Sequence, residues 1–130
     1  MAEAKTGSDG PSELIGLEYL EREHAHVRAR LAVTDDVRQP HGVVHGGIFS
    51  IIAESICSRA TGEAHDGEAA ALGQSSNATL LRPISSGYVN AEATARHQGR
   101  TTWVWDVEIT DDEERVCALV RMTVAVRERP

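Results

Sequence analysis

Residues 47–61 read GIFSIIAESICSRAT, and this stretch decides the fold. The run is too long for an ordinary strand, contains no proline and is followed by Gly62, a residue type that often ends helices. Apolar side chains fall on nearly every side of a helix drawn through it: Ile48, Phe49, Ile51, Ile52, Ala53, Ile56, Cys57 and Ala60. We therefore expect a central helix that is buried on most sides.

Five non-apolar residues of this helix are spaced by three and four, which places them on one stripe. A carboxylate at the middle of that stripe is costly to bury unless it is paired or faces a cleft. Glu54 is therefore either half of an ion pair, with Arg59 or another subunit, or a carboxylate poised as a nucleophile or general base. The members of the stripe are Gly47, Ser50, Glu54, Ser58 and Thr61.

The segment that precedes the helix, residues 41–47, reads HGVVHGG. Gly46 and Gly47 either form a simple tight turn or leave backbone N–H groups open to a ligand, as in an oxyanion site. His41 and His45 have the spacing of some metal ligands on a helix. The proline and glycines around them disfavour a helix there, and no further ligand set accompanies them, so we expect no metal.

Much of the remaining chain alternates apolar and polar residues with the period of two that is typical of strands. Residues 24–31 form the first such segment, with Val27, Ala29 and Leu31 on its apolar face. The following turns are short enough to join antiparallel neighbours. One helix and about five antiparallel strands predict an α+β domain. The four later strands are expected at about residues 69–81, 87–97, 101–109 and 115–126.

This expected architecture leaves the helix incompletely covered. A sheet curved around one helix covers three of its sides, and an apolar helix needs its fourth side covered as well. We therefore expect a partner subunit there, and hence at least a dimer.

Length and composition restrict the organisation and the partners of the protein. A chain of 130 residues fits one domain, expected at residues 14–130 after a disordered or frayed tail at 1–13. The net charge of −7 argues against a nucleic-acid partner. No apolar stretch of membrane-spanning length and no signal peptide are recognisable. Cys57 and Cys117 lack paired spacing, so we expect reduced thiols and a cytoplasmic protein.

Residues 39–47, QPHGVVHGG, are followed seven residues later by Glu54, and together they resemble the hotdog-fold acyl-CoA thioesterases of the phenylacetate-degradation type. The resemblance extends over about residues 17–126. Many members carry Asn where this chain has Gln39, and Asp where it has Glu54. With Gly46 and the hydroxyl of Ser58, these residues look most like the 4-hydroxybenzoyl-CoA thioesterase branch, in which Thr is usual at the position of Ser58.

The resemblance implies a hotdog fold, in which an antiparallel sheet wraps around one helix, and a homotetramer built from two dimers. It further implies hydrolysis of an acyl-CoA, in particular an aryl-CoA such as 4-hydroxybenzoyl-CoA, to the free acid and CoA, without a cofactor. In this family the N–H of Gly46 would polarise the thioester carbonyl. Glu54 of the facing subunit would attack the carbonyl carbon or activate water, Gln39 would orient the thioester or the water, and Ser58 would hold the water.

The same resemblance suggests where the substrate is held. His45 and Gly47 would shape the loop around the thioester. Residues 99–102, GRTT, resemble the nucleotide-contacting segment of the family, which makes Arg100, Thr101 and Thr102 candidates for binding CoA. Arg82 would add a guanidinium for a phosphate. The alternative for Arg100 is a solvated hairpin residue.

Two other functions fit the same residues. A hotdog hydratase or dehydratase acting on an acyl thioester would pair a catalytic His45 with an acid from the partner, so replacing His45 by Ala would abolish its activity. A non-catalytic module that senses acyl-CoA would bind such thioesters without releasing CoA.

Overall fold

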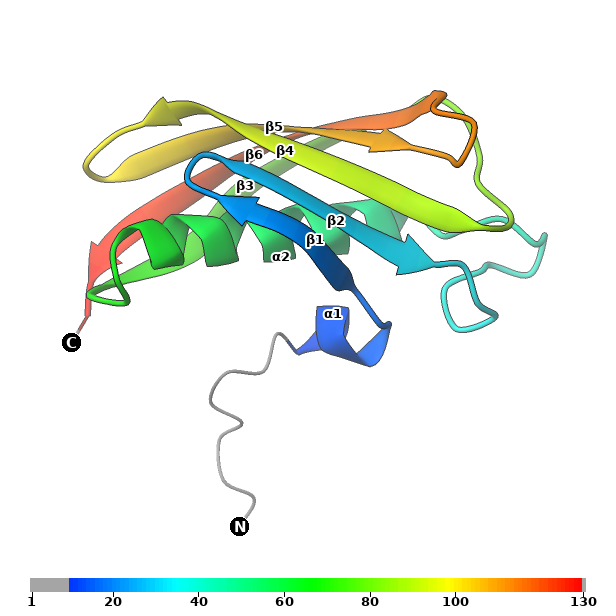
Figure 1. Cartoon of the computed structure of the whole chain (residues 1–130), viewed down its shortest axis with the longest axis horizontal. Coiled ribbons are helices and arrows are strands. Elements are labelled where there is room, and N and C mark those ends of the chain that lie inside the picture. Colours follow the sequence, from blue (N-terminus) through cyan, green and yellow to red (C-terminus); the bar gives the residue numbers. More distant parts are fainter. Residues whose placement is uncertain (1–9, 130) are drawn as a thin grey trace, which may run out of the picture.

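The structure, a computed structural model, describes residues 10–129 and consists of one long helix against one antiparallel sheet (Figure 1). The helix is α2 (Gly46–Ala64), and a short helix, α1 (Pro11–Leu14), packs beside it. The six strands are β1 (Glu18–Glu23), β2 (His26–Ala32), β3 (Ala69–Leu80), β4 (Tyr88–Gln98), β5 (Thr102–Thr110) and β6 (Val116–Glu128).

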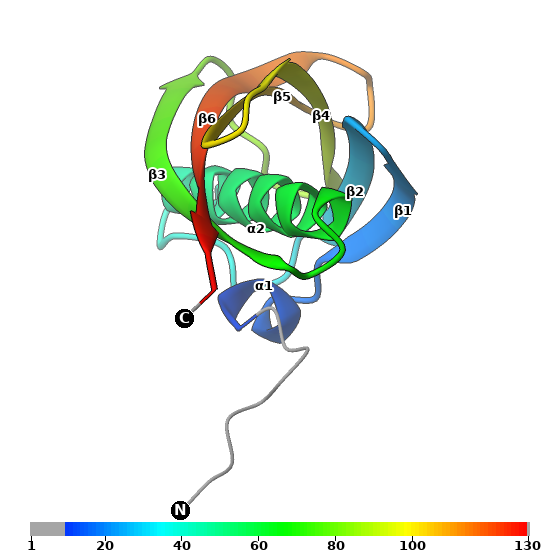
Figure 2. The same ribbon diagram turned by 90° about the vertical axis from the view of Figure 1, so that its left-hand side faces the viewer.

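The sheet has the strand order β1-β2-β4-β5-β6-β3 and curls around α2, with β3 and β1 at its two ends (Figure 2). Away from the curled sheet, α1 and the chain that leads from α2 into β3 lie below the helix in this view. This arrangement confirms the predicted hotdog fold of the α+β class.

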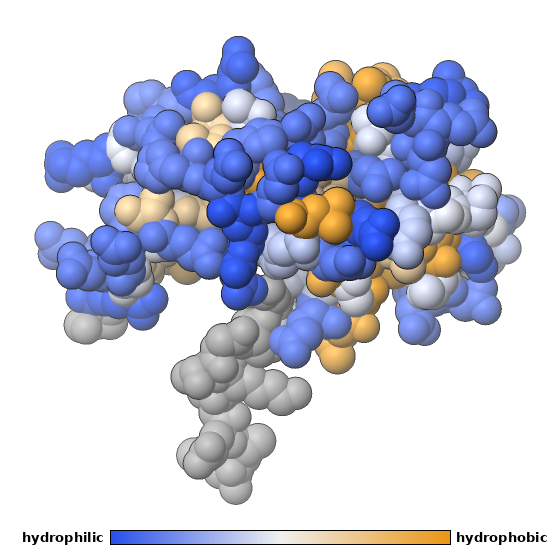
Figure 3. All heavy atoms as spheres, in the orientation of Figure 1, coloured by the Kyte–Doolittle hydropathy of each residue, from blue (hydrophilic) through white to orange (hydrophobic). Residues whose placement is uncertain are grey.

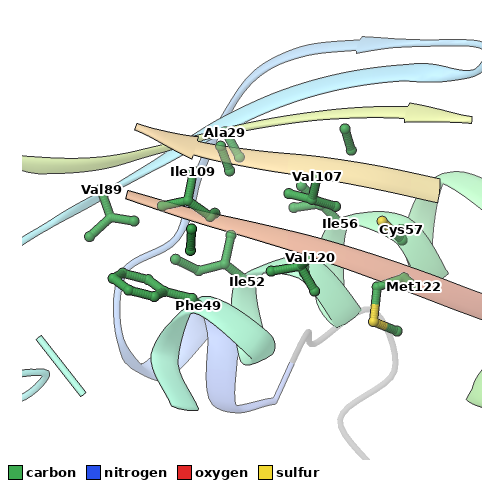
Figure 4. Close-up of a cluster of buried hydrophobic side chains, with 14 of the residues drawn as sticks. Ala29, Phe49, Ile52, Ile56, Cys57, Val89, Val107, Ile109, Val120 and Met122 are labelled. Atoms are coloured by element: carbon green, nitrogen blue, oxygen red, sulfur yellow. The ribbon is translucent and has the colours of Figure 1, made fainter. Parts of the chain in front are cut away.

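The core lies between the inner face of the sheet and α2 (Figure 4). It forms there because alternate residues of each inner strand point to the same side and meet the apolar faces of the helix. The sequence alternation predicted these faces correctly. Val27, Ala29 and Leu31 of β2 are buried, as are Trp103, Trp105, Val107 and Ile109 of β5.

The sheet differs from the sequence prediction in three respects. β1 was missed because it is an edge strand whose residues are mostly charged and exposed, so it shows no apolar alternation. β2 begins at His26 rather than residue 24, because Ala25 adopts a positive φ of 68° in the β1–β2 turn. β3 and β4 are not neighbours: β3 pairs with β6, and the chain crosses over to reach β4.

The helix is longer than predicted at its C-terminal end. α2 continues through Gly62 to Ala64. The chain reverses only at Asp66 and Gly67, whose φ angles of 52° and 74° are in the left-handed region, and the Gly67 N–H donates to the Gly62 carbonyl at 3.3 Å. Gly62 therefore supplies a capping carbonyl rather than the helix end.

The N-terminal boundary also differs. Residues 1–9 of the predicted tail lie outside the described residues, but Pro11–Leu14 form α1, in which Ser12 is buried. Pro11 stands near the helix start, where its fixed φ favours helical geometry.

Both cysteines are buried free thiols, and burial raises the pKa of the Cys57 thiol. No helix in the described part of the chain is both long enough and apolar enough to cross a membrane. On the face shown in Figure 3 hydrophilic residues predominate, with apolar patches between them.

Strand β3 contains an irregularity that matters for the site. Its pairing with β6 shifts register between Gly73 and Ser75, so Gln74 is an extra residue. Before this bulge the odd-numbered residues Ala71 and Gly73 face α2, and after it the even-numbered Leu80 does. On a regular strand every second residue faces the same side, so only an extra residue such as Gln74 can switch the inward face from odd to even positions.

Candidate active site

Glu54 lies at the middle of α2 and is exposed, and its side chain lies against Gly73 of the edge strand β3. Its surroundings form an open groove of about 450 Å³ between α2 and β3, with Pro11 of α1 also lining it. The carboxylate is exposed in the single chain. Glu54 is thus available to a ligand that enters this groove.

The proposed ion pair between Glu54 and Arg59 is not present. Arg59 pairs with Glu63 instead, at 3.7 Å, and Glu63 also accepts a hydrogen bond from Arg22 at 3.2 Å. Within residues 10–129 Glu54 forms neither an ion pair nor a hydrogen bond. The structure therefore removes Arg59 as the explanation of this carboxylate.

Ser58, one turn further along α2, lines the same groove. Its Oγ is buried and has no hydrogen-bond partner among residues 10–129. Buried hydroxyls are normally hydrogen-bonded, so this oxygen is available to hold water or substrate beside Glu54.

Thr61 does not belong to this polar stripe. It is buried, donates to the Cys57 carbonyl at 2.8 Å and accepts a hydrogen bond from the Trp105 indole N–H at 2.9 Å. Its hydrogen bond with Trp105 places it against β5, so it is buried under the sheet rather than open to the groove.

Gly46 and Gly47 are the first two residues of α2, with His45 as the N-cap residue. Amide N–H groups at these positions have no carbonyl one turn earlier in the helix to bond, and they lie at the positive end of the helix dipole. A Cβ at Gly46 would lie 2.5 Å from Cδ1 of Leu80. The start of the helix therefore provides the predicted donors and places them against the end of β3.

His45 is exposed, and its side chain makes no capping hydrogen bond. Its backbone N–H donates to the Val37 carbonyl at 3.0 Å. This bond fixes the loop just before Gly46.

Gln39 also lies in the loop before α2, where its side chain and its carbonyl both accept hydrogen bonds within a turn. Its Oε1 accepts from the His41 N–H at 2.9 Å, and its carbonyl accepts from the Gly42 N–H at 2.9 Å. Gln39 does not line the Glu54 groove.

Two parts of the predicted site are therefore separated within one chain. Gly46 and Glu54 are eight residues apart on one helix, a rise of roughly 12 Å at about 1.5 Å per residue. A carbonyl bound at the Gly46 N–H cannot also touch the carboxylate of Glu54 from the same chain.

The candidate CoA-binding residues are separated too. Arg82 precedes β4, whereas Arg100 and Thr101 follow it, at the opposite end of this 11-residue strand. All three side chains are exposed. The Thr101 carbonyl accepts a hydrogen bond from the Val126 N–H, and the Thr102 carbonyl accepts one from the Gly99 N–H across the β4–β5 hairpin. One chain does not bring Arg82 and Arg100 to the same ligand.

In the described range, no three His, Cys, Asp or Glu side chains gather as metal ligands would. A larger hollow of about 510 Å³ lies over strands β3 to β6 on the outer face of the sheet. It contains none of the candidate residues, and both of its arginines pair with Asp106, with Arg121 donating to that carboxylate at 2.8 Å. We therefore place the site in the Glu54 groove.

Gly73 lines this groove but was not predicted from the sequence. The available signal was a glycine inside a predicted strand, which often marks a bulge or the close approach of another group.

Known proteins resemble this chain over most of its length. A family model described as the thioesterase superfamily matches residues 41–118. A 1,4-dihydroxy-2-naphthoyl-CoA hydrolase from Listeria monocytogenes is 34% identical over 120 residues, covering 92% of this chain and 98% of that protein. The proofreading thioesterase EntH from Klebsiella pneumoniae is 32% identical over 112 residues, covering 86% and 82%.

A solved structure shows the same similarity in three dimensions. A mutant thioesterase from Pseudomonas aeruginosa has a TM-score of 0.87 and 33% identity to this chain, covering 91% of this chain and 86% of that one. The extent of these matches, together with the hotdog fold and its open carboxylate, leads to one conclusion: the chain belongs to the thioesterase superfamily and is a thioester hydrolase.

Proposed function

We propose that this enzyme hydrolyses an aryl-CoA thioester, such as 4-hydroxybenzoyl-CoA, to the free carboxylic acid and CoA. The observation that carries the proposal is the Glu54 carboxylate, which stands without an ion pair in residues 10–129 and lines an open groove beside the buried Ser58 hydroxyl. The resemblance to a hydrolase of an aromatic CoA thioester supports the aryl class.

In the proposed reaction the Gly46 N–H polarises the thioester carbonyl and Glu54 supplies the basic or nucleophilic oxygen. If Glu54 acts as base, it takes a proton from water as the water oxygen bonds to the carbonyl carbon. The C–S bond then breaks and the proton passes to the departing thiolate. If Glu54 is the nucleophile, its oxygen bonds to the carbonyl carbon as the C–S bond breaks and CoA leaves as the thiolate. Water then hydrolyses the resulting anhydride, which frees the acid and restores the Glu54 carboxylate, and the proton released passes to the thiolate. Both routes require the carboxylate and no cofactor.

The roughly 12 Å rise between Gly46 and Glu54 supports a site shared by two chains. β3 ends the sheet, and its residues from Leu72 to Leu80 are exposed. An unpaired edge of this kind can pair with a second copy. We propose that two chains join antiparallel through β3, forming a dimer, and that two dimers form a tetramer.

The contacts of α2 with β3 indicate the register of this pairing. Gly46 lies against Leu80, and Glu54 lies against Gly73. Antiparallel pairing centred near Ser76 and Asn77 would set Leu80 of one chain opposite Gly73 of the other. The Gly46 N–H of one subunit would then approach Glu54 of its partner. The same two-fold arrangement would also allow different chains to contribute Arg82 and Arg100 to one CoA.

The test is thiol release measured across aromatic and aliphatic CoA thioesters, on the wild-type protein and on Glu54→Gln. The amide keeps the size of the side chain but cannot act as base or nucleophile, so kcat should fall at least about 10²-fold while the melting temperature is maintained. Glu63→Gln, the same change on the same helix, should retain turnover. Near-normal turnover by Glu54→Gln would refute the mechanism, and a clear preference for long aliphatic chains would refute the aryl assignment.

A further inference from the structure

Gly73 stands on β3 directly opposite Glu54, at the start of the bulge that contains Gln74. Both residues line the same groove. The backbone of β3 and the carboxylate of α2 thus meet at a position where the strand has no side chain.

The backbone conformation of Gly73 does not explain why glycine stands there. Five glycines in the described chain have a positive φ, and Gly73 is not among them. Its backbone is therefore accessible to alanine without the strain that L-residues meet in the left-handed region. The reason for glycine must lie in its surroundings.

The surroundings supply a steric reason. A Cβ at Gly73 would lie 2.5 Å from Oε2 of Glu54, 3.1 Å from its Cγ and 3.2 Å from its Cδ. All three atoms belong to one flexible side chain, which is exposed to solvent in the single chain. An added methyl group would therefore displace the Glu54 carboxylate rather than the backbone of the sheet.

We propose that Gly73 is a positioning residue: the absence of a side chain lets the Glu54 carboxylate lie against β3, in the place from which it reaches the thioester. This inference rests on the role of Glu54 proposed above. It assigns to the bulged edge strand a part in catalysis, because the strand fixes how far the carboxylate extends into the groove.

The test is a double-mutant cycle of Gly73→Ala with Glu54→Asp, with kcat, KM and melting temperature measured for each protein. Gly73→Ala should lower kcat at least about 10-fold with little change in KM, because misplacing a reacting group by about 1 Å can cost roughly 10²-fold. In the Glu54→Asp background, where the shorter acid withdraws from the methyl group, Gly73→Ala should cost less than about 2-fold. Gly62→Ala is the matched control, because its Cβ would meet only the Cβ of Ala71, at 3.7 Å.

The possible outcomes separate a positioning role of Gly73 from a requirement of the backbone for glycine. The same loss in both backgrounds, or undiminished kcat in Gly73→Ala, would overturn the positioning role. Failure of both Gly73→Ala proteins to fold would also overturn it, since the requirement for glycine would then be one of the backbone. If only the double mutant folded, the contact with the Glu54 side chain would be confirmed as the cause. Full activity of Glu54→Gln would instead show that the proposed function had failed.

Discussion

Gly46 and Glu54 have separate tasks in the proposed mechanism. Gly46 offers a backbone N–H at the first position of α2, and Glu54 offers a carboxylate from the middle of the helix. In the proposed mechanism the N–H stabilises the charge that develops on the carbonyl oxygen, so its removal should slow the chemical step more than it weakens binding.

Gly46→Pro tests this role without deleting the helix. Proline is well tolerated at the first helical position, and His45, with φ −57° and ψ 133°, already has the extended conformation favoured before proline. The substitution removes one N–H, and kcat should fall about 10²- to 10³-fold. Gly46→Ala is the control, because it places a Cβ against the same Leu80 side chain but keeps the N–H. Equal activities of the two variants would contradict an oxyanion role for this N–H.

Single-residue predictions succeeded where helical spacing carried the information. The spacing of Glu54 and Ser58 predicted correctly that they share one face, and the structure places both in one groove. Thr61 is not open to the groove, because Trp105 of β5 covers it, and helical spacing alone does not show which strand packs over a position. Gly73 was missed because its importance comes from a contact between distant segments, which no local pattern encodes.

At the scale of elements, α2 is attached to the sheet by a polar contact inside the core. The Trp105 indole N–H of β5 donates to the Thr61 hydroxyl at 2.9 Å, and both residues are fully buried. Water cannot easily reach this position to replace either partner. Removing the Thr61 hydroxyl would therefore leave the Trp105 N–H buried without an acceptor, which costs more stability than the net strength of the hydrogen bond.

Thr61→Val should therefore destabilise the protein. Valine keeps the branched shape and has a similar helix propensity, but it leaves the Trp105 N–H without its acceptor, at a cost of about 1–3 kcal/mol in the free energy of unfolding. Thr61→Ser keeps the hydroxyl and should cost under about 1 kcal/mol, the value of a buried methyl group. Urea unfolding measures both. A valine variant as stable as the wild type would show that the hydrogen bond has no structural weight.

A helix or strand could be predicted from the sequence where it has an apolar face that produces a regular pattern. α2 and the strands β2, β4, β5 and β6 bury one face each, and their alternation or helical period was visible in the sequence. β1 buries almost nothing, so it left no such signal. The pairing of β3 with β6 was not predictable from turn length, because a crossover of similar length is also sterically possible.

At the scale of the whole molecule, the apolar helix already implied a partner, and the structure adds a second reason. The proposed dimer, paired through β3, would account together for the exposed side of α2, the exposed edge of β3 and the distance between Gly46 and Glu54. The sequence could not reveal the register of that dimer, because it depends on how α2 lies along β3.

Subunit complementation tests the shared site most directly. Glu54→Gln and Gly46→Pro chains, each inactive in isolation, are mixed, unfolded and refolded together, and thiol release from an aryl-CoA is measured. In a mixed dimer one site combines the intact Gly46 of one chain with the intact Glu54 of the other, and the second site carries both substitutions. Random pairing should therefore restore roughly a quarter of wild-type activity, because half the dimers are mixed and each has one working site. Activity no higher than that of the unmixed variants would contradict a site built from two chains.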